Sequence, residues 1–316
     1  MSELQPHSVV VFAPARVDLS PGFTDVEPLC REVPGQIVNV ALDLGVEVTV
    51  RDENDATMPN SFADRLCGAV ARRLAIKRPC VSLSAPSLPS GSGLGMSGAL
   101  SVALAYASSV LAGASTDPLE LADLACAAER DSGLTGGTQD QLASVYGGAG
   151  VVHRHGGLGK REPLEIDLAT LAARLVLVYG SGSRNSGSII EHVLHERPRA
   201  AVLRTVAAMN RVSSTLARSL VDGDHEILAD AMNESTALLR ELHVDIVDKD
   251  FDDRLRMLGA TASKPCGAGG AGAVWMALVD PGRRARFVDR VVAEGLSVLP
   301  AAPSAMGARR VQPHRR

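Results

Sequence analysis

The sequence lacks several features that would point to whole classes of protein. Aromatic residues make up only 3% of its 316 positions, too few for the stacking surfaces on which single-stranded nucleic acids bind. A formal net charge of −4 provides no basic field for nucleic acid or for an anionic membrane. No uncharged apolar run reaches the roughly 18 residues of a transmembrane helix. We therefore expect small-molecule partners, with no nucleic acid and no membrane among them.

The sequence also lacks a patterned set of cysteines. Five are present: Cys30, Cys67, Cys80, Cys126 and Cys266. Their odd number and the absence of C-x-x-C spacing argue against a disulfide framework and against a structural zinc site. The apolar run from Val9 to Ala13 is short and ends at Pro14, so it does not resemble a signal peptide. We expect a cytoplasmic protein in a reducing compartment.

What the sequence does contain is a glycine-rich loop that leads into an apolar helical stretch, Leu88-Pro-Ser-Gly-Ser-Gly-Leu-Gly-Met-Ser-Gly-Ala-Leu-Ser101. Glycines allow positive φ and let the backbone approach a ligand closely. The first N–H groups of a following helix have no intrahelical partner, and the macrodipole adds partial positive charge there. Such a site binds an anion without a basic side chain. We interpret the loop as a phosphate cradle, in which Ser92, Ser97 and Ser101 reach a phosphate oxygen or a metal.

Two familiar nucleotide loops fit these glycines poorly. Gly93 to Gly98 matches the G-x-G-x-x-G fingerprint of dinucleotide-binding proteins. However, Pro86 and Pro89 separate the glycines from the expected strand at 80–85, whereas the dinucleotide turn follows its strand directly. The G-x-x-x-x-G-K-[ST] pattern of a P-loop occurs nowhere in the sequence. The interpretation of the protein as a nicotinamide-dependent dehydrogenase therefore rests on these six residues alone.

Hydrophobic patterning changes near residue 180. Before it, the patterns predict strands at 8–13, 36–41, 46–51, 80–85, 150–153 and 175–179 and helices at 62–76, 98–112 and 117–129. Residues 14–25 and 132–148 are expected to be loops that carry acidic residues. After it, the patterns predict helices at 199–221, 224–242 and 282–294 and strands at 273–279 and 297–299. The sequence thus predicts an α/β protein with an antiparallel or mixed sheet in its N-terminal part and a helix-rich C-terminal part.

Four ordered motifs resemble those of the GHMP small-molecule kinases, the family of galactokinase, homoserine kinase and mevalonate kinase. Residues 89–97 resemble the P-x-x-x-G-L-G-S-S loop, with Met96 in place of the first serine. Residues 13–25 resemble the A-P-x-R-(I/V)-x-(L/F)-x-G-G-x-T-D motif of the sugar-kinase arm, although Ser20-Pro-Gly-Phe23 replaces a glycine triplet. Residues 139–141 resemble its G-x-x-D-Q motif, and residues 264–272 its last glycine-rich motif, which Ala271 interrupts. Within that arm, the motifs are most similar to those of the D-glycero-D-manno-heptose 7-phosphate kinases and of fucokinase-like members.

The resemblance implies a two-domain α/β (α+β) fold with the active site in the cleft between the domains. The N-terminal domain, 1–180, would hold a mixed sheet, the ATP loop and the catalytic base, and the helix-rich C-terminal α+β domain would cover 181–316. The implied activity is transfer of the γ-phosphate of ATP, with Mg²⁺, to a hydroxyl of a sugar or sugar phosphate, and the heptose kinases point to the anomeric hydroxyl. The resemblance leaves the oligomeric state open, with a homodimer among the options.

The resemblance also implies roles for single residues. Asp140 matches the catalytic base, and Arg16 matches the arginine that would hold its carboxylate ionised. Ser97 and Glu129 match the Mg²⁺ ligands, oxygen donors that suit a hard cation. Nucleotide phosphates are expected along Pro89, Gly91, Ser92, Gly93, Leu94, Gly95, Met96, Ser97 and Gly98. The acceptor is expected at Thr24, Asp25, Gly267, Ala268, Gly269 and Gly270, with Arg184 as a clamp for a phosphate already on the substrate.

Two rival functions of the same fold stay open. One is a kinase with a non-sugar alcohol as acceptor, against which the T-D and Q-D-Q residues weigh. The other is a catalytically silent sensor of sugar and ATP, against which the joint presence of Asp140, Arg16 and Glu129 weighs. His192 and His195 are three residues apart but lack further ligands, so we interpret them as surface or core histidines rather than as a metal site.

Overall fold

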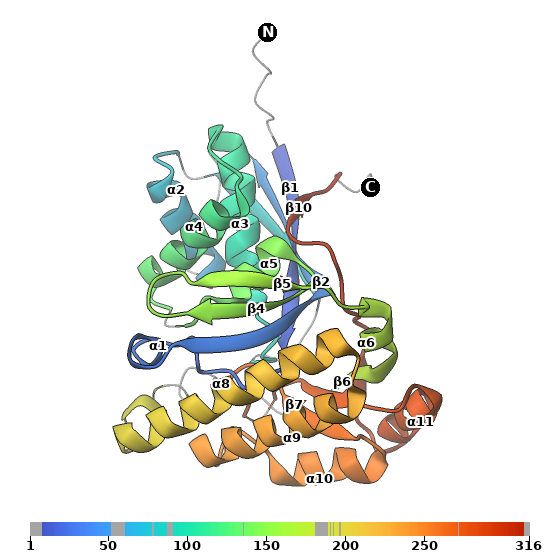
Figure 1. Ribbon diagram of the computed structural model, residues 1–316. Helices are drawn as coiled ribbons and strands as arrows, with labels where there is room; N and C mark the ends of the chain where they lie inside the picture. The colour runs from blue at the N-terminus through green and yellow to red at the C-terminus, as the bar shows by residue number, and fades with distance from the viewer. Residues whose placement is uncertain are drawn as a thin grey trace.

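The computed structural model consists of two antiparallel sheets that follow one another along the molecule, each covered by helices (Figure 1). It describes residues 8–51, 61–77, 79–86, 91–134, 136–180, 189, 191, 193–195, 197–270 and 272–312. The larger sheet has the order β10-β1-β2-β4-β5, and β3 pairs with β2. Its strands are β1 (Ser8–Asp18), β2 (Gly35–Arg51), β3 (Cys80–Ser84), β4 (Ala149–Arg154), β5 (Lys160–Leu164) and β10 (Arg309–Arg310).

The smaller sheet has the order β7-β8-β6-β9. Its strands are β6 (Leu175–Tyr179), β7 (Ala262–Pro265), β8 (Trp275–Leu278) and β9 (Ser297–Leu299). Every strand pair that the structure describes is antiparallel, so the larger sheet is antiparallel rather than mixed. The smaller sheet begins before residue 180, and the C-terminal β10 returns to the larger sheet. The two sheets therefore do not divide the chain into two continuous halves.

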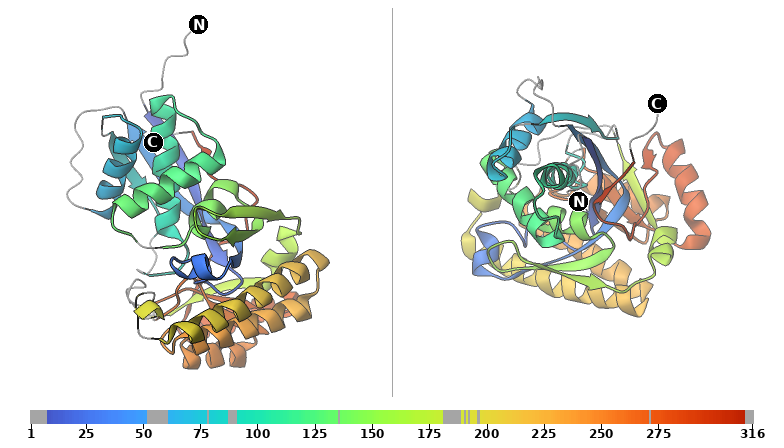
Figure 2. Two further views of the ribbon diagram at one scale, coloured as in Figure 1. Left: turned by 60° about the vertical axis from the view of Figure 1, so that its left-hand side comes forward. Right: turned by 90° about the horizontal axis from the view of Figure 1, so that it is seen from above.

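Helices cover the sheets in two groups (Figures 1 and 2). Beside the larger sheet lie α2 (Phe62–Arg73), α3 (Met96–Ala112), α4 (Pro118–Asp131) and α5 (Gln139–Tyr146). Beside the smaller sheet lie α9 (His225–Leu242), α10 (Lys249–Leu258) and α11 (Arg284–Ala293). The long helix α8 (Arg199–Asp222) packs on α9 and also contacts β2 of the larger sheet. The short elements are α1 (Leu29–Glu32), α6 (Leu168–Arg174) and the 3₁₀ helix η1 (Pro281–Arg283). In the described part of the chain, none of these helices combines the length and the apolar content that crossing a bilayer requires.

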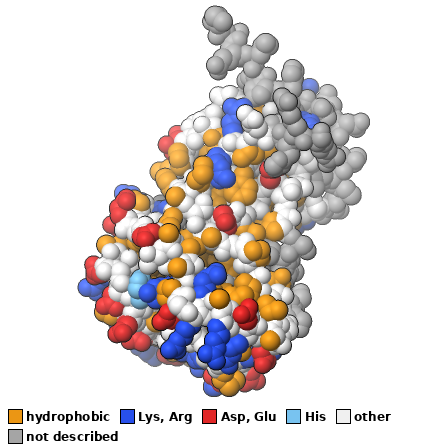
Figure 3. All heavy atoms as spheres, turned by 90° about the vertical axis from the view of Figure 1, so that its right-hand side faces the viewer, with side chains coloured by type: hydrophobic (Ala, Val, Ile, Leu, Met, Phe, Trp, Pro, Cys, Tyr) orange, Lys and Arg blue, Asp and Glu red, His pale blue; other side chains and the backbone are white. Residues whose placement is uncertain are grey.

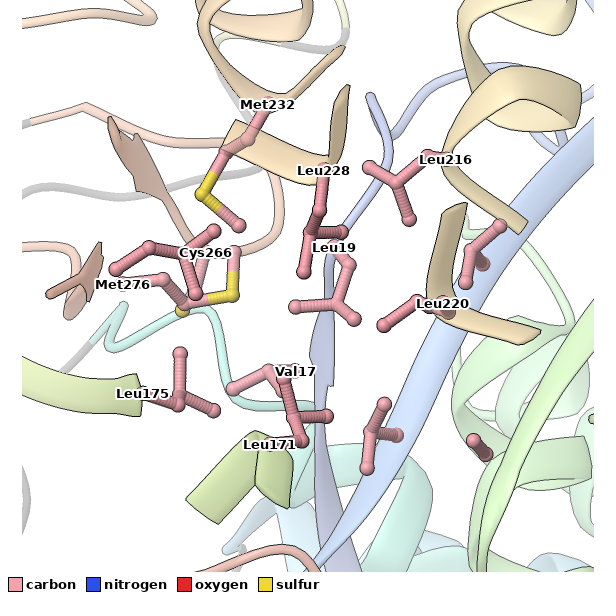
Figure 4. Packing of buried hydrophobic residues seen from close by; sticks show 14 of the residues in the cluster. Val17, Leu19, Leu171, Leu175, Leu216, Leu220, Leu228, Met232, Cys266 and Met276 are labelled. Carbon is pink, nitrogen blue, oxygen red and sulfur yellow. The ribbon is translucent and has the colours of Figure 1, made fainter. Parts of the chain in front are cut away.

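A single hydrophobic cluster lies between the two sheets, and we call it the shared core (Figure 4). β1 contributes Val17, the position just after its end contributes Leu19, and α8 contributes Leu216 and Leu220. The smaller sheet and its surroundings contribute Leu175, Met232, Cys266 and Met276. Each of these side chains is at most 9% exposed, so the sheets are joined by a packed interior.

β1 continues through residues 14–18, where the sequence predicted a loop. Alternation of side chains along the strand sends Ala15, Val17 and then Leu19 into the shared core. The same alternation places Arg16 and Asp18 together on the opposite face, with Arg16 Nη1 3.6 Å from Asp18 Oδ1. The pairing of β1 with β2 shifts register between Pro14 and Arg16. Tertiary packing of the apolar residues thus overrides the proline and aspartate that suggested a loop.

The surface carries charges of both signs. On the face over α6 and α11, acidic and basic side chains lie among hydrophobic ones (Figure 3).

The five cysteines are all free thiols.

Candidate active site

A cavity of about 400 Å³ lies where the glycine-rich loop, the segment after β1 and the loop after β7 meet. Its walls come from all four motif regions of the sequence: Arg16, Gly22, Phe23, Asp25, Val26, residues 91–97, Glu129, Leu134, Gly136, Gly137, residues 139–141, Gly267 and Ala268. Segments up to 250 residues apart in the chain therefore form one site.

Asp140 and Arg16 form the charged centre of this cavity. Arg16 Nε donates a hydrogen bond to Asp140 Oδ1 at 2.8 Å, and Nη2 lies 2.7 Å from the same oxygen. The Asp140 side chain is 24% exposed and the Arg16 side chain only 5%, so the arginine lies behind the carboxylate. Burial lowers the pKa of Arg16, but the charges of Asp140 and Asp18 outweigh burial and raise it above its ordinary value. The guanidinium is therefore a fixed positive charge beside Asp140.

Glycines bring the loop against this pair. Gly95 is the N-cap of α3 with a φ of 68°, and a Cβ on it would lie 3.1 Å from the carboxyl carbon of Asp140. A Cβ on Gly98, in the first turn of α3, would lie 2.4 Å from Asp140 Cβ. The N-terminus of α3 therefore faces the same space as Asp140. A phosphate bound by the loop would lie next to the carboxylate.

Gly93 brings the loop against the opposite wall of the site. Its φ is 77°, and a Cβ on it would lie 2.1 Å from the carbonyl oxygen of Cys266. Val274 N also donates to Ser92 O at 2.9 Å. The glycine-rich loop is thus packed directly against the C-terminal part of the chain. Leu94 lines the cavity, and its side chain is buried in the shared core.

Asp25, which the sequence suggested for the acceptor, has a second role that the sequence did not reveal. Its Oδ2 accepts hydrogen bonds from the backbone N–H groups of Thr138 at 2.8 Å and Gln139 at 3.1 Å. Burial raises the pKa of Asp25, and these hydrogen bonds oppose that shift. Asp25 therefore fixes the start of α5, the helix that carries Asp140, while it also lines the cavity. Its neighbour Thr24 is fully buried, donates to Gln36 O at 3.2 Å and is not part of the cavity wall.

Glu129 and Ser97 lie on the cavity wall at the ends of two helices. Glu129 Oε2 accepts a hydrogen bond from Gln141 Nε2 at 2.6 Å, and Glu129 Oε1 is buried without a partner. Burial, helped by the charge of Asp140, raises the pKa of Glu129 to about 7. A buried carboxylate oxygen without a partner, on the same cavity wall as the Ser97 hydroxyl, fits a hard cation such as Mg²⁺ that keeps several waters. No cluster of three or more acidic, histidine or cysteine ligands occurs among the described residues, so a cation here would take its further ligands from phosphate oxygens and water.

Lys264 and Asp18 form a buried ion pair that the sequence analysis missed. Lys264 Nζ lies 2.9 Å from Asp18 Oδ2, and both side chains are 0% exposed. The same ammonium donates to Asp18 O at 2.9 Å and Pro265 O at 3.0 Å. Both residues lie inside quoted motifs, but only the fold shows that β1 and β7 place them in contact.

The last glycine-rich segment lies at the cavity only in part. Gly267 and Ala268 line the cavity, whereas Gly269 and Gly270 do not. Gly267 N donates to Asp18 Oδ1, Gly269 N to Cys266 O and Gly270 N to Ile246 O. These three N–H groups have partners within the protein, and the acceptor contacts expected for the segment stay a prediction. Ser101 Oγ donates to Gly98 O at 2.8 Å, and Ser101 is not among the residues that line the cavity. Pro89, Arg184 and His192 lie outside the described residues.

Residues 65–148 match the family model described as "GHMP kinases N terminal domain". This part of the chain, which holds the glycine-rich loop, Glu129 and Asp140, therefore matches the N-terminal domain of the GHMP kinases, as the motifs predicted. Together with the fold and the cavity, the match supports a small-molecule kinase, a phosphotransferase with an alcohol acceptor.

Whole-chain comparisons agree with this family. The chain is 26% identical over 310 residues to a D-glycero-alpha-D-manno-heptose 7-phosphate kinase of Campylobacter jejuni, covering 87% of this chain and 90% of that protein. It is 22% identical over 313 residues to a bifunctional fucokinase/GDP-fucose pyrophosphorylase of Arabidopsis thaliana, covering 85% of this chain and 30% of that protein. Its fold is similar to that of a D-glycero-D-manno-heptose 1-phosphate kinase from "Bacteriodes thetaiotaomicron", with a TM-score of 0.74, 20% identity and coverage of 97% and 100% of the two chains.

Proposed function

We propose that the protein is an ATP-dependent sugar kinase similar to the heptose 7-phosphate kinases. It would transfer the γ-phosphate of ATP to the anomeric hydroxyl of a sugar or sugar phosphate. The observation that carries the proposal is the Asp140–Arg16 pair at the centre of the cavity, directly against the N-terminus of α3. This arrangement places a proton acceptor, a fixed cation and a phosphate-binding backbone around one space.

In this proposal, Asp140 is the general base. Its carboxylate is open to the cavity and accepts the proton of the acceptor hydroxyl as that oxygen attacks the γ-phosphorus. Arg16 orients Asp140 through two contacts to Oδ1 and places a positive charge beside it. The γ-phosphate bond to the β-phosphate oxygen breaks, and ADP leaves with the displaced electron pair.

The glycine-rich loop and the first turn of α3 bind the phosphates of ATP through backbone N–H groups and the helix dipole. The residues that would hold Mg²⁺ are Ser97 and Glu129, the pair on the cavity wall with an unpartnered carboxylate oxygen. When bound, Mg²⁺ would neutralise charge on the phosphate oxygens. Gln141 orients Glu129 through its hydrogen bond to Oε2.

The acceptor would lie between Asp140 and the wall formed by residues 22–26 and 267–268. Asp25, on that wall, would accept hydrogen bonds from sugar hydroxyls, and Arg184 would clamp a phosphate on the substrate. A heptose 7-phosphate is the first acceptor to test, because the Campylobacter jejuni relative, which this chain matches over 90% of that protein's length, carries that name. We propose domains at 1–180 and 181–316, with the site between them.

The test is ADP release from Mg²⁺-ATP with free sugars, heptose and hexose phosphates, cyclitols and homoserine as acceptors. Asp140→Asn should lower kcat by about 10³-fold or more while ATP binding persists, because only the base is lost. Asp123→Asn, on the exposed face of α4, is the matched control and should retain wild-type turnover. Turnover restricted to homoserine would identify a non-sugar kinase. ATP binding without turnover on any acceptor would favour the silent sensor.

A further inference from the structure

Four charged side chains form a row from β7 to the cavity, in the order Lys264, Asp18, Arg16 and Asp140. The successive contacts are 2.9 Å from Lys264 Nζ to Asp18 Oδ2, 3.6 Å from Asp18 Oδ1 to Arg16 Nη1 and 2.7 Å from Arg16 Nη2 to Asp140 Oδ1. The signs alternate along the row. The exposed fraction of the side chains rises from 0% at Lys264 and Asp18 to 24% at Asp140, so only the last charge reaches the cavity openly.

The C-terminal part of the chain determines the orientation of Asp18. Its Oδ2 accepts a hydrogen bond from Lys264, and its Oδ1 accepts one from Gly267 N at 2.8 Å. Arg16, at 3.6 Å from Oδ1, lies beyond hydrogen-bond distance of this carboxylate. Arg16 instead directs Nε and Nη2 to Asp140. Arg16 therefore has two carboxylate neighbours and hydrogen-bonds only one of them.

The preference of Arg16 for Asp140 depends on Lys264. A fully buried carboxylate without a countercharge is strongly unfavourable, so Asp18 without Lys264 would recruit the nearest remaining cation, which is Arg16. We infer that Lys264 is a positioning residue for catalysis: by satisfying Asp18, it leaves Arg16 to orient Asp140. Lys264 does not line the cavity, so it acts through Asp18 and Arg16 rather than on substrate. The inference rests on the proposed kinase function, in which Asp140 is the base.

A cycle of three variants tests this positioning. Lys264→Met removes the ammonium and leaves Asp18 to compete for Arg16, so kcat should fall on the order of 10-fold to 100-fold with little change in KM for ATP. Asp18→Asn removes the competing carboxylate, so it should retain most of the wild-type kcat. The double variant, Lys264→Met with Asp18→Asn, should also retain most of the wild-type kcat, because it lacks the Asp18 carboxylate that would compete for Arg16. Lys160→Met, on the exposed β5, is the matched lysine control and should leave kcat unchanged.

Rescue in the double variant separates positioning from a purely structural role. If Lys264 acts through Asp18, then removal of Asp18 should restore the kcat that Lys264→Met loses, with KM for ATP unchanged throughout. A structural role would instead lower activity in all three variants. Thermal melts and ATP binding establish that each variant is folded.

A measurement without turnover keeps this inference separate from the proposed function. A crystal structure of Lys264→Met, solved beside that of the wild type, should show Arg16 hydrogen-bonded to Asp18 rather than to Asp140. If the wild type phosphorylates no acceptor, the kinase proposal fails while this comparison still tests the row. If Lys264→Met does not fold, Asp18→Asn and the double variant decide, because loss of kcat in either overturns the inference. Wild-type kcat in folded Lys264→Met, or an unchanged Arg16–Asp140 contact in its structure, overturns it equally.

Discussion

Gly98 and Asp140 are in direct contact, with no space for a side chain between them. A Cβ on Gly98 would lie 2.4 Å from Asp140 Cβ and 3.4 Å from the Asp140 carbonyl carbon. This contact fixes the distance between the first turn of α3, where the phosphates are proposed to bind, and the proposed base.

Gly98→Ala should reduce kcat on the order of 100-fold, because the methyl group displaces Asp140 from Arg16 and from the α3 terminus. Steady-state kinetics with the acceptor identified in the panel measure this effect. Gly68→Ala in α2 is the matched control, since its Cβ would meet only Arg72 Nη1, at 3.5 Å. It should stabilise the protein by about 0.5–1 kcal/mol, as replacement of a helical glycine by alanine usually does, with kcat unchanged. Equal kcat in the two variants would contradict the proposed contact.

Asp25→Ala should destabilise the protein even without substrate. The substitution leaves the buried N–H groups of Thr138 and Gln139 without their acceptor, at a cost of about 1–3 kcal/mol each before relaxation. Urea denaturation of the ligand-free protein measures the change. Asp117→Ala provides the control, because Asp117 also accepts from two backbone N–H groups but on an exposed helix end, where the loss is about 1 kcal/mol. A smaller loss for Asp25→Ala than for Asp117→Ala would show that Asp25 does not hold α5.

The stability of the protein in Mg²⁺-free buffer should depend on Glu129. Burial raises its pKa from an ordinary value of 4.5 to about 7, so between these values the folded protein holds a proton that the unfolded chain has lost. The free energy of unfolding should therefore fall as pH rises through this window, by at most about 3 kcal/mol from this group. In Glu129→Gln this pH-dependent part of the free energy of unfolding should vanish. In Glu120→Gln, a control at an exposed position of α4, it should remain. Parallel pH dependence in wild type and Glu129→Gln would contradict the assignment.

Mg²⁺ should oppose the fall in stability at higher pH, because it binds the ionised carboxylate of Glu129. We expect the stabilisation by Mg²⁺, measured as a thermal shift, to grow from pH 6 to pH 8 and to be absent in Glu129→Gln. A pH-independent shift that persists in the variant would place the cation elsewhere.

Gly93→Ala should destabilise the protein and weaken ATP binding together. Its Cβ would lie 2.1 Å from Cys266 O, so the glycine-rich loop would have to move away from the C-terminal segment. Gly223→Ala is a control with nearly the same φ, 71° against 77°, and with nothing within 4 Å of its Cβ. Both variants share the strain of a positive φ, about 1–2 kcal/mol, so the excess loss in Gly93→Ala measures the contact itself. Isothermal calorimetry with ATP should show weaker binding only in Gly93→Ala.

The sequence predicted the helices that have strong periodicity, including the one expected at 117–129, which is α4 and begins at Pro118 with Asp117 as its N-cap. It also predicted that Asp140 and Arg16 lie together, because the motifs of the family carry that information. Local patterns could not show that β1 passes through Pro14, or that residues 36–41 and 46–51 form one strand, because pairing with β1 determines both. The expectation of a loop around Asp140 was also too coarse, since Asp25 holds these residues as the first turn of α5.

The Lys264–Asp18 pair shows why the rest of the site was not predictable. The two residues are 246 positions apart, and neither spacing nor charge distinguishes this lysine from one on the surface. Only the approach of β7 to the end of β1 makes Lys264 a partner of Asp18. The internal partners of the Gly267, Gly269 and Gly270 N–H groups were not predictable for a related reason, since a glycine-rich segment does not reveal which of its N–H groups are hydrogen-bonded inside the protein.

The shared core has a consequence for how the molecule comes apart. Because side chains from β1, α8 and both sheets are buried in one cluster, separating the two halves would expose the apolar interior of each. A fragment that ends near residue 180 would carry that surface into solvent and should aggregate rather than fold. Heat or denaturant should therefore disrupt both halves in one cooperative transition, and the two lobes around the cavity should behave as a single thermodynamic unit.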